Sequence, residues 1–292
     1  MSSAPGSPAV VVGIDGSPAA TAAAIWAAGE ASSRDIPLRL VHAVAPPGDL
    51  SRARQVLDSA VEAVEVMDTP VKIETQLTCG TPAAVLRAGA RGAVLLCVGS
   101  AGLAEQRVGS NIGSTAAAVA CVPHCPVVIV HSAGAYRGDP GWVVAEVSDS
   151  STAERTLAHA VEEALLRGAP LRVIATWPSR YPDIYDDEAV STKNRLVKAR
   201  WERRLTAWRQ RYPGLDIHAQ AVPGSILNYL ARQQKNISLV VVPHERAADL
   251  SDLLTPRDGV PGGCFDIFVC EPDDQPAPVA GHDRRRSTEQ SG

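Results

Sequence analysis

The chain has 292 residues and a mass of 30.6 kDa, which is enough for two domains of ordinary size. Hydrophobic residues make up 45% of it and charged residues 21%, a composition that excludes an intrinsically disordered protein. The formal net charge of -4 and the pI of about 6.0 argue against a concentrated basic face for nucleic acid, and no apolar run is long enough to cross a membrane. Residues 1–8 show no basic segment before an apolar stretch, so we expect no signal peptide and a cytoplasmic protein.

The first predicted unit is a strand, a helix and a second strand. Residues 9–14 form a short apolar run, typical of a strand that is buried on both faces of a parallel sheet. Ser17 followed by Pro18 is a helix-start signal, and the alanine-rich stretch up to residue 33 predicts a helix that turns Ile25 and Trp26 toward the sheet. Residues 38–44 predict the second strand.

Asp15 lies between the first strand and its helix. A carboxylate at this place can cap the helix that follows, or it can bind a ligand at the edge of the sheet. Taken by itself, the residue leaves both interpretations open.

The remaining elements of this half continue the alternation. They are a helix over 51–66, a strand over 71–77, a helix from 81 to 86, a strand over 94–98, a helix that ends near Pro123 and a strand over 127–130. Five strands joined by four helices predict an α/β, flavodoxin-like, doubly wound domain with a mainly parallel sheet of order 3-2-1-4-5. Ligands bind where this order reverses, between strands 1 and 4, which brings Asp15 and Gly99 together.

The loop over residues 100–113 has the composition of a phosphate site. Bare backbone N–H groups and a helix N-terminus that face the same space can bind phosphate. The residues at the required places are Gly99, Gly102, Gly113, Ser114 and Thr115. The sequence has no G-x-x-x-x-G-K-[ST] motif and hence no P-loop lysine, so slow hydrolysis is the most that we expect.

This segment resembles the nucleotide loop of the universal stress protein family. ATP-binding members of that family have a glycine, two residues, a glycine, nine residues, and then a glycine followed by serine or threonine. Gly99, Gly102 and Gly113 match this motif, except that ten residues separate the second and third glycines here. The extra residue lies between Leu103 and Ile112, in a stretch that contains the sequence AEQR at residues 104–107.

The resemblance implies an ATP site in the first half of the chain. Asp15 would hold the nucleotide or a Mg²⁺ ion, because carboxylate oxygens are the ligands that Mg²⁺ prefers. Gly13 belongs to the same strand-end sequence, and the backbone of residues 41–43, beginning at Val41, would face the adenine. Such a protein would change its conformation or its partners when the nucleotide binds.

After a turn-rich linker at residues 131–141 the pattern repeats. The sequence IPLRLV at 36–41 returns as APLRVI at 169–174, so we expect two copies of one fold in tandem. The expected domains are residues 1–132 and 141–271, followed by a disordered tail at 272–292. Exposed strand edges are usually covered, and the resemblance implies that the last strands of two such domains pair across a two-fold interface. We therefore expect residues 127–130 and 267–269 to pair pseudo-symmetrically within the chain.

The second copy lacks the nucleotide residues. Its sequence Glu146-Val147-Ser148-Asp149 stands where the first copy has Gly13-Ile14-Asp15-Gly16. Pro243 corresponds to Gly99, and proline has no N–H group for a phosphate. We therefore expect ATP in the N-terminal half alone, and a structural or partner-binding role for the other half.

Two further patterns have structural interpretations. Residues 197, 201, 205 and 208 form an apolar helical stripe with the basic side chains mostly off it, which favours a core-facing helix over a nucleic-acid surface. The six cysteines show no C-x-x-C spacing, and we expect them to be buried as small hydrophobic residues. Cys121, His124 and Cys125 do not complete a zinc shell.

Two hypotheses of different classes follow for the function. The first is a cytoplasmic ATP-binding regulator of stress adaptation that acts on an unidentified protein partner, with a homodimer left open. The second is a scaffold of the same fold in which the longer loop abolishes nucleotide binding. A hydrolase has little support, because no G-x-S-x-G elbow occurs.

Overall fold

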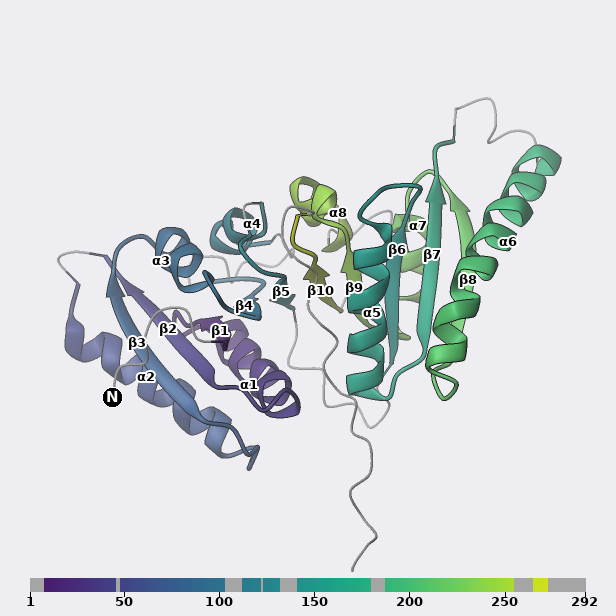
Figure 1. The fold of residues 1–292 in the computed structure, drawn as a ribbon. Helices are drawn as coiled ribbons and strands as arrows, with labels where there is room; N and C mark the ends of the chain where they lie inside the picture. The colour runs from purple at the N-terminus through teal and green to yellow at the C-terminus, as the bar shows by residue number, and fades with distance from the viewer. Residues whose placement is uncertain are drawn as a thin grey trace, which may run out of the picture.

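The computed structural model describes residues 8–45, 48–102, 112–121, 123–131, 141–179, 187–254 and 265–272. They form one ten-stranded sheet covered by helices (Figure 1). The N-terminal half consists of β1 (Val10–Gly13), α1 (Pro18–Ser33), β2 (Leu38–Val44), α2 (Leu50–Glu65), β3 (Ile73–Cys79), α3 (Pro82–Gly89), β4 (Leu95–Gly99), α4 (Ser114–Ala120) and β5 (Val127–Val130). The C-terminal half consists of β6 (Trp142–Val147), α5 (Ala153–Arg167), β7 (Leu171–Trp177), α6 (Asp187–Arg211), β8 (Ile217–Pro223), α7 (Leu227–Gln233), β9 (Ile237–Val242), the 3-10 helix η3 (His244–Asp249), α8 (Leu250–Leu254) and β10 (Asp266–Val269).

The strand order divides the sheet into two equivalent halves. It runs β3-β2-β1-β4-β5-β10-β9-β6-β7-β8. Within each half every pair of neighbours is parallel, and the order counted from the first strand of that half is 3-2-1-4-5. The prediction of two tandem flavodoxin-like, doubly wound units is confirmed.

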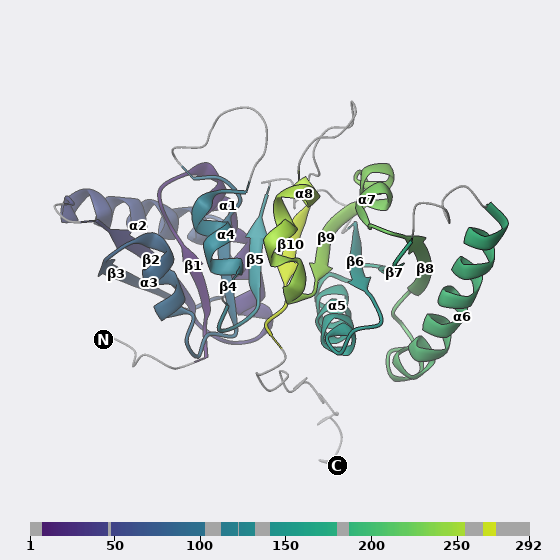
Figure 2. The ribbon, with the colours of Figure 1, turned by 90° about the horizontal axis from the view of Figure 1, so that it is seen from above.

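The two halves meet at an antiparallel seam between β5 and β10, where Val128 lies opposite Phe268 and Ile129 opposite Ile267. Figure 2 shows these two strands between the halves. The predicted pairing of the last strands is therefore confirmed. Because the seam is antiparallel, the carboxyl ends of the strands of one half lie at the opposite edge of the sheet from those of the other half.

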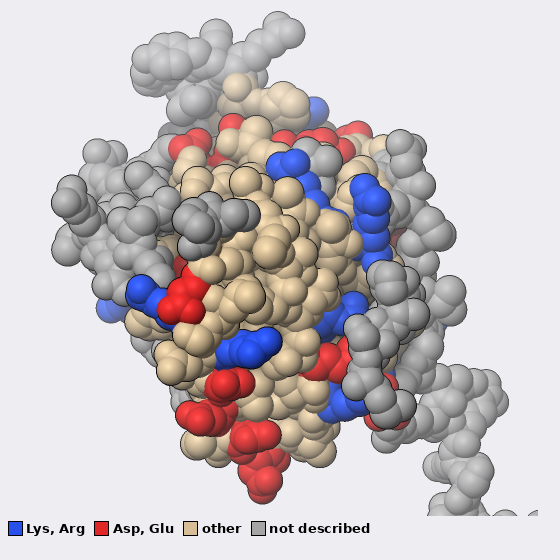
Figure 3. All heavy atoms as spheres, turned by 90° about the vertical axis from the view of Figure 1, so that its left-hand side faces the viewer, with Lys and Arg blue, Asp and Glu red and all other residues tan. Residues whose placement is uncertain are grey.

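The sheet separates two apolar layers. Leu38 and Leu40 of β2 contribute to the layer under α1, α2, α5 and α6, and Val41 contributes to the layer on the other face. On the side of the molecule shown in Figure 3, the basic side chains are spread out, with acidic and uncharged surface between them. The described residues of that face therefore form no concentrated basic patch of the kind that binds nucleic acid.

Helix α1 packs on the sheet through alanines. Its buried positions are Ala20, Ala23, Ala24, Ala27, Ala28, Glu30 and Ala31. Ile25 and Trp26, which were predicted to face the sheet, are only half-buried. Trp26 packs against the edge of this core layer and lies under the Arg167 guanidinium at 5.0 Å from the ring centroid. Small side chains allow the helix backbone to approach the strands closely, so the larger residues are displaced to its flanks.

Helix α6 packs as predicted. Trp201 and Leu205 are fully buried, and Val197 and Trp208 pack beside them as partly buried residues. The guanidinium of Arg204 stacks 4.1 Å from the Trp201 ring centroid. The apolar stripe therefore belongs to the core of the C-terminal half.

The cysteines are less uniform than expected. Cys97, Cys125 and Cys270 are buried, whereas Cys79 and Cys121 are exposed, and Cys264 lies outside the described residues. Over the described part of the chain, no three histidine, cysteine or acidic side chains come together as metal ligands, and no helix is long and apolar enough to cross a membrane. The domain limits stay a prediction, and most of the expected tail lies beyond the described residues.

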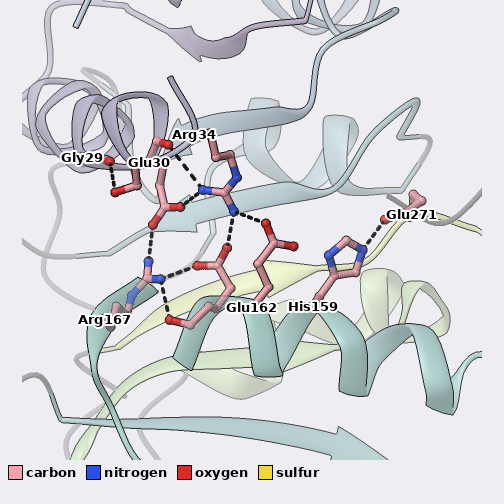
Figure 4. A network of polar contacts seen from close by, with 9 residues as sticks. Gly29, Glu30, Arg34, His159, Glu162, Arg167 and Glu271 are labelled. Carbon is pink, nitrogen blue, oxygen red and sulfur yellow. Dashed lines mark hydrogen bonds and ion pairs between the residues drawn. The ribbon is translucent and has the colours of Figure 1, made fainter. Parts of the chain in front are cut away.

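A network of buried ion pairs joins α1 to α5 across the seam (Figure 4). Glu30 pairs with Arg34 and Glu163 pairs with Arg167, each four residues apart on its own helix. The two pairs also cross, with Arg34 Nη2 lying 3.0 Å from Glu163 Oε1 and Arg167 Nη2 lying 2.8 Å from Glu30 Oε1. Glu162 adds a further contact to Arg34 at 3.2 Å. The seam is thus held by ionic as well as apolar contacts.

Candidate functional site

A cavity of about 310 Å³ opens at the carboxyl ends of β1, β2 and β4. Every residue predicted for the nucleotide site lines it, namely Gly13, Asp15, Val41, Gly99, Gly102, Gly113, Ser114 and Thr115. Ser17, Pro82, Leu86 and Val98 line it as well, although the sequence reasoning did not assign them to the site. Ser17 and Pro82 had a signal of their own, because both mark the start of a helix that leads away from this edge.

Asp15 does not cap α1 itself but holds the residue that does, and it also lines the cavity. Its Oδ1 accepts the Ser17 N–H at 2.8 Å, and the Ser17 hydroxyl in turn accepts the Ala20 N–H at 3.1 Å as the N-cap of α1. A Cβ built on Gly102 would lie 3.0 Å from Asp15 Oδ2. Glycine at 102 therefore leaves space beside Oδ2, and this second carboxylate oxygen can bind a ligand.

Gly99 is required for packing before any ligand is considered. A Cβ at this position would lie 2.6 Å from the carbonyl carbon of Ala19 and 2.8 Å from the backbone nitrogen of Ala20. Gly99 thus lets the first turn of α1 cross the end of β4, and it does so whether or not a nucleotide binds.

Gly99→Ala should lower the free energy of unfolding by about 1–3 kcal/mol, because the new methyl group meets backbone that cannot move aside. Gly29 lies in α1 and has no atom within 4 Å of an added Cβ, so Gly29→Ala should instead raise the free energy of unfolding by about 0.5–1 kcal/mol. Urea denaturation of both variants checks the pair. Equal effects would contradict a packing role for Gly99.

Gly113 and the residues after it form the other wall. Gly113 is the N-cap of α4, and its N–H donates to the Ser100 carbonyl at 2.7 Å, so this N–H is not free for a phosphate. Its φ of -61° is allowed to any residue, so a glycine here is not required by backbone conformation. Ser114 and Thr115 follow in the first turn of α4 and line the same cavity. The loop at 103–111, with the extra residue, lies outside the described residues.

The opposite wall is apolar and comes from β2 and α3. The Val41 carbonyl accepts the Ile14 N–H at 2.9 Å, which leaves its second lone pair for a base. The Nδ1 of His42 lies 2.6 Å from the Ile14 carbonyl oxygen and donates to it, since a carbonyl can only accept. No lysine or arginine occurs among the described lining residues, which leaves Asp15 as the carboxylate of a cavity without a basic side chain.

The corresponding place in the C-terminal half is filled by an ion pair. Glu146 of β6 stands in the sheet where β1 has Gly13, and its carboxylate accepts from the Arg246 Nε at 2.9 Å. Arg246 belongs to η3, which begins directly after Pro243, the counterpart of Gly99. Glu146 is 6% exposed, so its side chain occupies space that the glycine leaves open in the other half. This is a physical reason why the second copy should not bind a nucleotide in the same way.

Burial raises the pKa of the Glu146 carboxyl, and Arg246 only partly offsets it. A carboxyl whose pKa is raised by folding stabilises the fold fully below its unfolded pKa, and this contribution is lost as the pH rises through the folded value. The parent should therefore lose stability relative to Glu146→Gln as the pH rises above about 4.5. Urea unfolding of both proteins between about pH 4 and pH 7 measures this. If the difference in unfolding free energy between the two proteins does not change with pH, the pKa of Glu146 is not raised by folding.

Comparisons with known proteins agree with the two-copy architecture. A sequence model described as the universal stress protein family matches residues 8–131 and again residues 143–256. Universal stress protein Rv3134c of Mycobacterium tuberculosis is 40% identical over 256 residues, which cover 85% of this chain and 92% of that protein. Universal stress protein Rv2028c of the same organism is 38% identical over 267 residues, covering 87% and 91%.

A solved structure shows the same fold. The crystal structure of a universal stress protein from Archaeoglobus fulgidus DSM 4304 superposes with a TM-score of 0.63 at 15% identity, covering 91% of this chain and 97% of that one. Two family matches in one chain, relatives matched over nearly their full length and the two halves of the sheet, each of order 3-2-1-4-5, agree with one another. The chain therefore belongs to the universal stress protein family and carries two copies of the family domain in tandem.

Proposed function

We propose that this protein binds ATP in the cavity of its N-terminal half and acts as a nucleotide-responsive regulator of stress adaptation. One observation carries the proposal. The residues that the sequence predicted for a nucleotide come from three strands, from the loops that follow two of them and from the start of α4, and all line the same cavity where the strand order reverses.

The two walls of the cavity suit the two ends of a nucleotide. Val41, Leu86 and Val98 supply apolar surface for a base, and Asp15, Ser114 and Thr115 supply polar groups at the other side. Because the described lining holds a carboxylate and no basic side chain, the charge of a triphosphate calls for a cation. A Mg²⁺ ion bound through Asp15 Oδ2 would be this cation, since the other oxygen, Oδ1, already accepts the Ser17 N–H.

The proposed activity is binding with at most slow hydrolysis. Among the described residues of the cavity there is no lysine to stabilise a transferring phosphoryl group. The His42 ring is tied to the Ile14 carbonyl through Nδ1, and no sequence motif marks a nucleophile beside it. The regulator would act in the cytoplasm through a protein partner whose affinity depends on the bound nucleotide.

One specific observation favours a second candidate, a scaffold that binds no nucleotide. Gly99 is explained by helix packing, so this matching glycine has a reason to be present without ATP, and the Gly113 N–H is already bonded to the Ser100 carbonyl. In that case both halves serve assembly alone.

Equilibrium dialysis of the full chain with radiolabelled ATP, with and without Mg²⁺, separates the two candidates. The regulator predicts saturable binding that strengthens with Mg²⁺ and weakens in Asp15→Asn. The scaffold predicts no saturable binding in either buffer, and this result would reject the proposed function.

A further inference from the structure

A second cavity, of about 170 Å³, lies at the seam and is built by both halves. Arg34 of α1 and the residues that precede β4 and β5 form one side. His159 and Glu162 of α5, with Phe268 and Glu271 at the end of β10, form the other. The cavity therefore exists only when the two halves are docked, and it is separate from the residues of the proposed nucleotide site.

The polar groups in its walls are held in place. His159 is 4% exposed and Glu271 is 3% exposed, and His159 Nε2 lies 2.9 Å from Glu271 Oε2. Arg155 Nη1 binds the other oxygen of Glu271 at 2.9 Å, and the His159 ring packs 5.0 Å from that of Phe268. The orientation of the imidazole is thus fixed by a carboxylate on one side and an aromatic ring on another.

Two acceptors remain free in this cavity. With Nε2–H donating to Glu271, a neutral His159 ring has its lone pair on Nδ1, and no hydrogen bond from the described residues reaches that atom. Glu162 uses Oε1 for Arg34 at 3.2 Å, while no hydrogen bond or ion pair from the described residues reaches its Oε2. Figure 4 shows the second ring nitrogen of His159 and the second oxygen of Glu162 turned toward the same space, one helical turn apart on α5.

The charges point the same way as the hydrogen-bonding groups. Ion pairs connect four carboxylates, those of Glu30, Glu162, Glu163 and Glu271, with three guanidinium groups, those of Arg34, Arg155 and Arg167. With these seven groups ionised and the His159 ring neutral, the group carries one excess negative charge. Burial and the negative charge of Glu163 raise the pKa of Glu30. A proton on Glu30 would also neutralise the excess charge, but this carboxyl does not line the cavity.

We propose that the seam cavity binds a small organic cation with N–H donors, such as a primary ammonium ion. The ammonium group would donate to His159 Nδ1 and Glu162 Oε2, and its short carbon chain would lie against Phe268. A ligand held between both halves would stabilise their docking, because it binds the folded chain and not the unfolded one.

Ethylammonium chloride is the probe, titrated into the full chain at about pH 8 with sodium chloride matched in the control. Tetramethylammonium carries the same charge but has no N–H donor, so it serves as the matched ligand. We expect saturable binding of ethylammonium by calorimetry, a shift of the His159 Nδ1 resonance in nitrogen NMR, and neither effect with tetramethylammonium.

Glu162→Gln should weaken ethylammonium binding by about tenfold or more, since a hydrogen bond to a charged acceptor is lost. Folding should survive, because Glu162 is the more exposed partner of Arg34, which keeps Glu30 and Glu163. Glu65→Gln, at the exposed end of α2, should bind as the parent does. No saturable binding to the parent, equal binding of the two ammonium ions, or unchanged binding in Glu162→Gln would each overturn the proposal.

Discussion

Arg34→Met is expected to lower the free energy of unfolding by about 3–5 kcal/mol. The change removes the cation that neutralises Glu30 and Glu163, of which Glu163 has a side chain only 1% exposed. Arg167 would then be the remaining cation between two buried carboxylates, and breaking one partner of a buried pair leaves an uncompensated charge. Urea denaturation at neutral pH measures the loss.

Arg200→Met provides the matched control. Arg200 pairs with Asp149 at 2.5 Å, but their side chains are 53% and 62% exposed, so water screens the pair. We expect a change of less than about 1 kcal/mol. If both substitutions cost the same, the ion pairs across the seam contribute no more than surface pairs do, and the account of the seam is wrong.

The second large effect concerns the wall of the nucleotide cavity. Gly113→Val should weaken ATP binding by more than about a hundredfold, because a branched side chain would occupy space between Gly113 and the proposed phosphate. The backbone at 113 already has a φ that valine adopts, so the variant should fold. Radiolabelled ATP binding gives the affinity, and circular dichroism verifies the fold.

Ser114→Ala is the comparison for that experiment. It removes one hydroxyl that can donate to a charged phosphate, a loss of about 1.5–3 kcal/mol, or roughly ten- to a hundredfold in affinity. The order of the two variants therefore tests whether backbone approach or side-chain bonding dominates. If a folded Gly113→Val variant binds ATP with the affinity of the unsubstituted protein, Gly113 does not belong to the nucleotide site.

The sheet could be predicted from the sequence because its strands are short, continuous apolar runs. Residues 10–13, 95–99 and 127–130 are buried on both faces, and this burial is what such runs indicate. The edge strand β3 spans 73–79 and not the predicted 71–77. In a half-exposed strand the apolar pattern marks the first and last residues less clearly. The face of α1 was missed, since alanines at most positions give no apolar stripe to read.

The candidate site could be predicted as far as its residues follow the strand ends. The ion pair that fills the corresponding place in the C-terminal half could not be predicted, because Glu146 and Arg246 are 100 positions apart in the sequence and meet only in the folded chain. The seam network carried a signal that the sequence reasoning did not use. Glutamate followed by arginine four residues later occurs on both equivalent helices, at Glu30 and Arg34 and again at Glu163 and Arg167.

The number of ATP molecules bound per chain shows whether the N-terminal half alone holds a nucleotide site. Isothermal titration calorimetry of the full-length chain, freed of nucleotide and supplied with Mg²⁺, should give one site per chain, and Asp15→Ala should weaken it strongly. Two equivalent sites would contradict the closure of the C-terminal half by Glu146 and Arg246, and no site at all would contradict nucleotide binding itself.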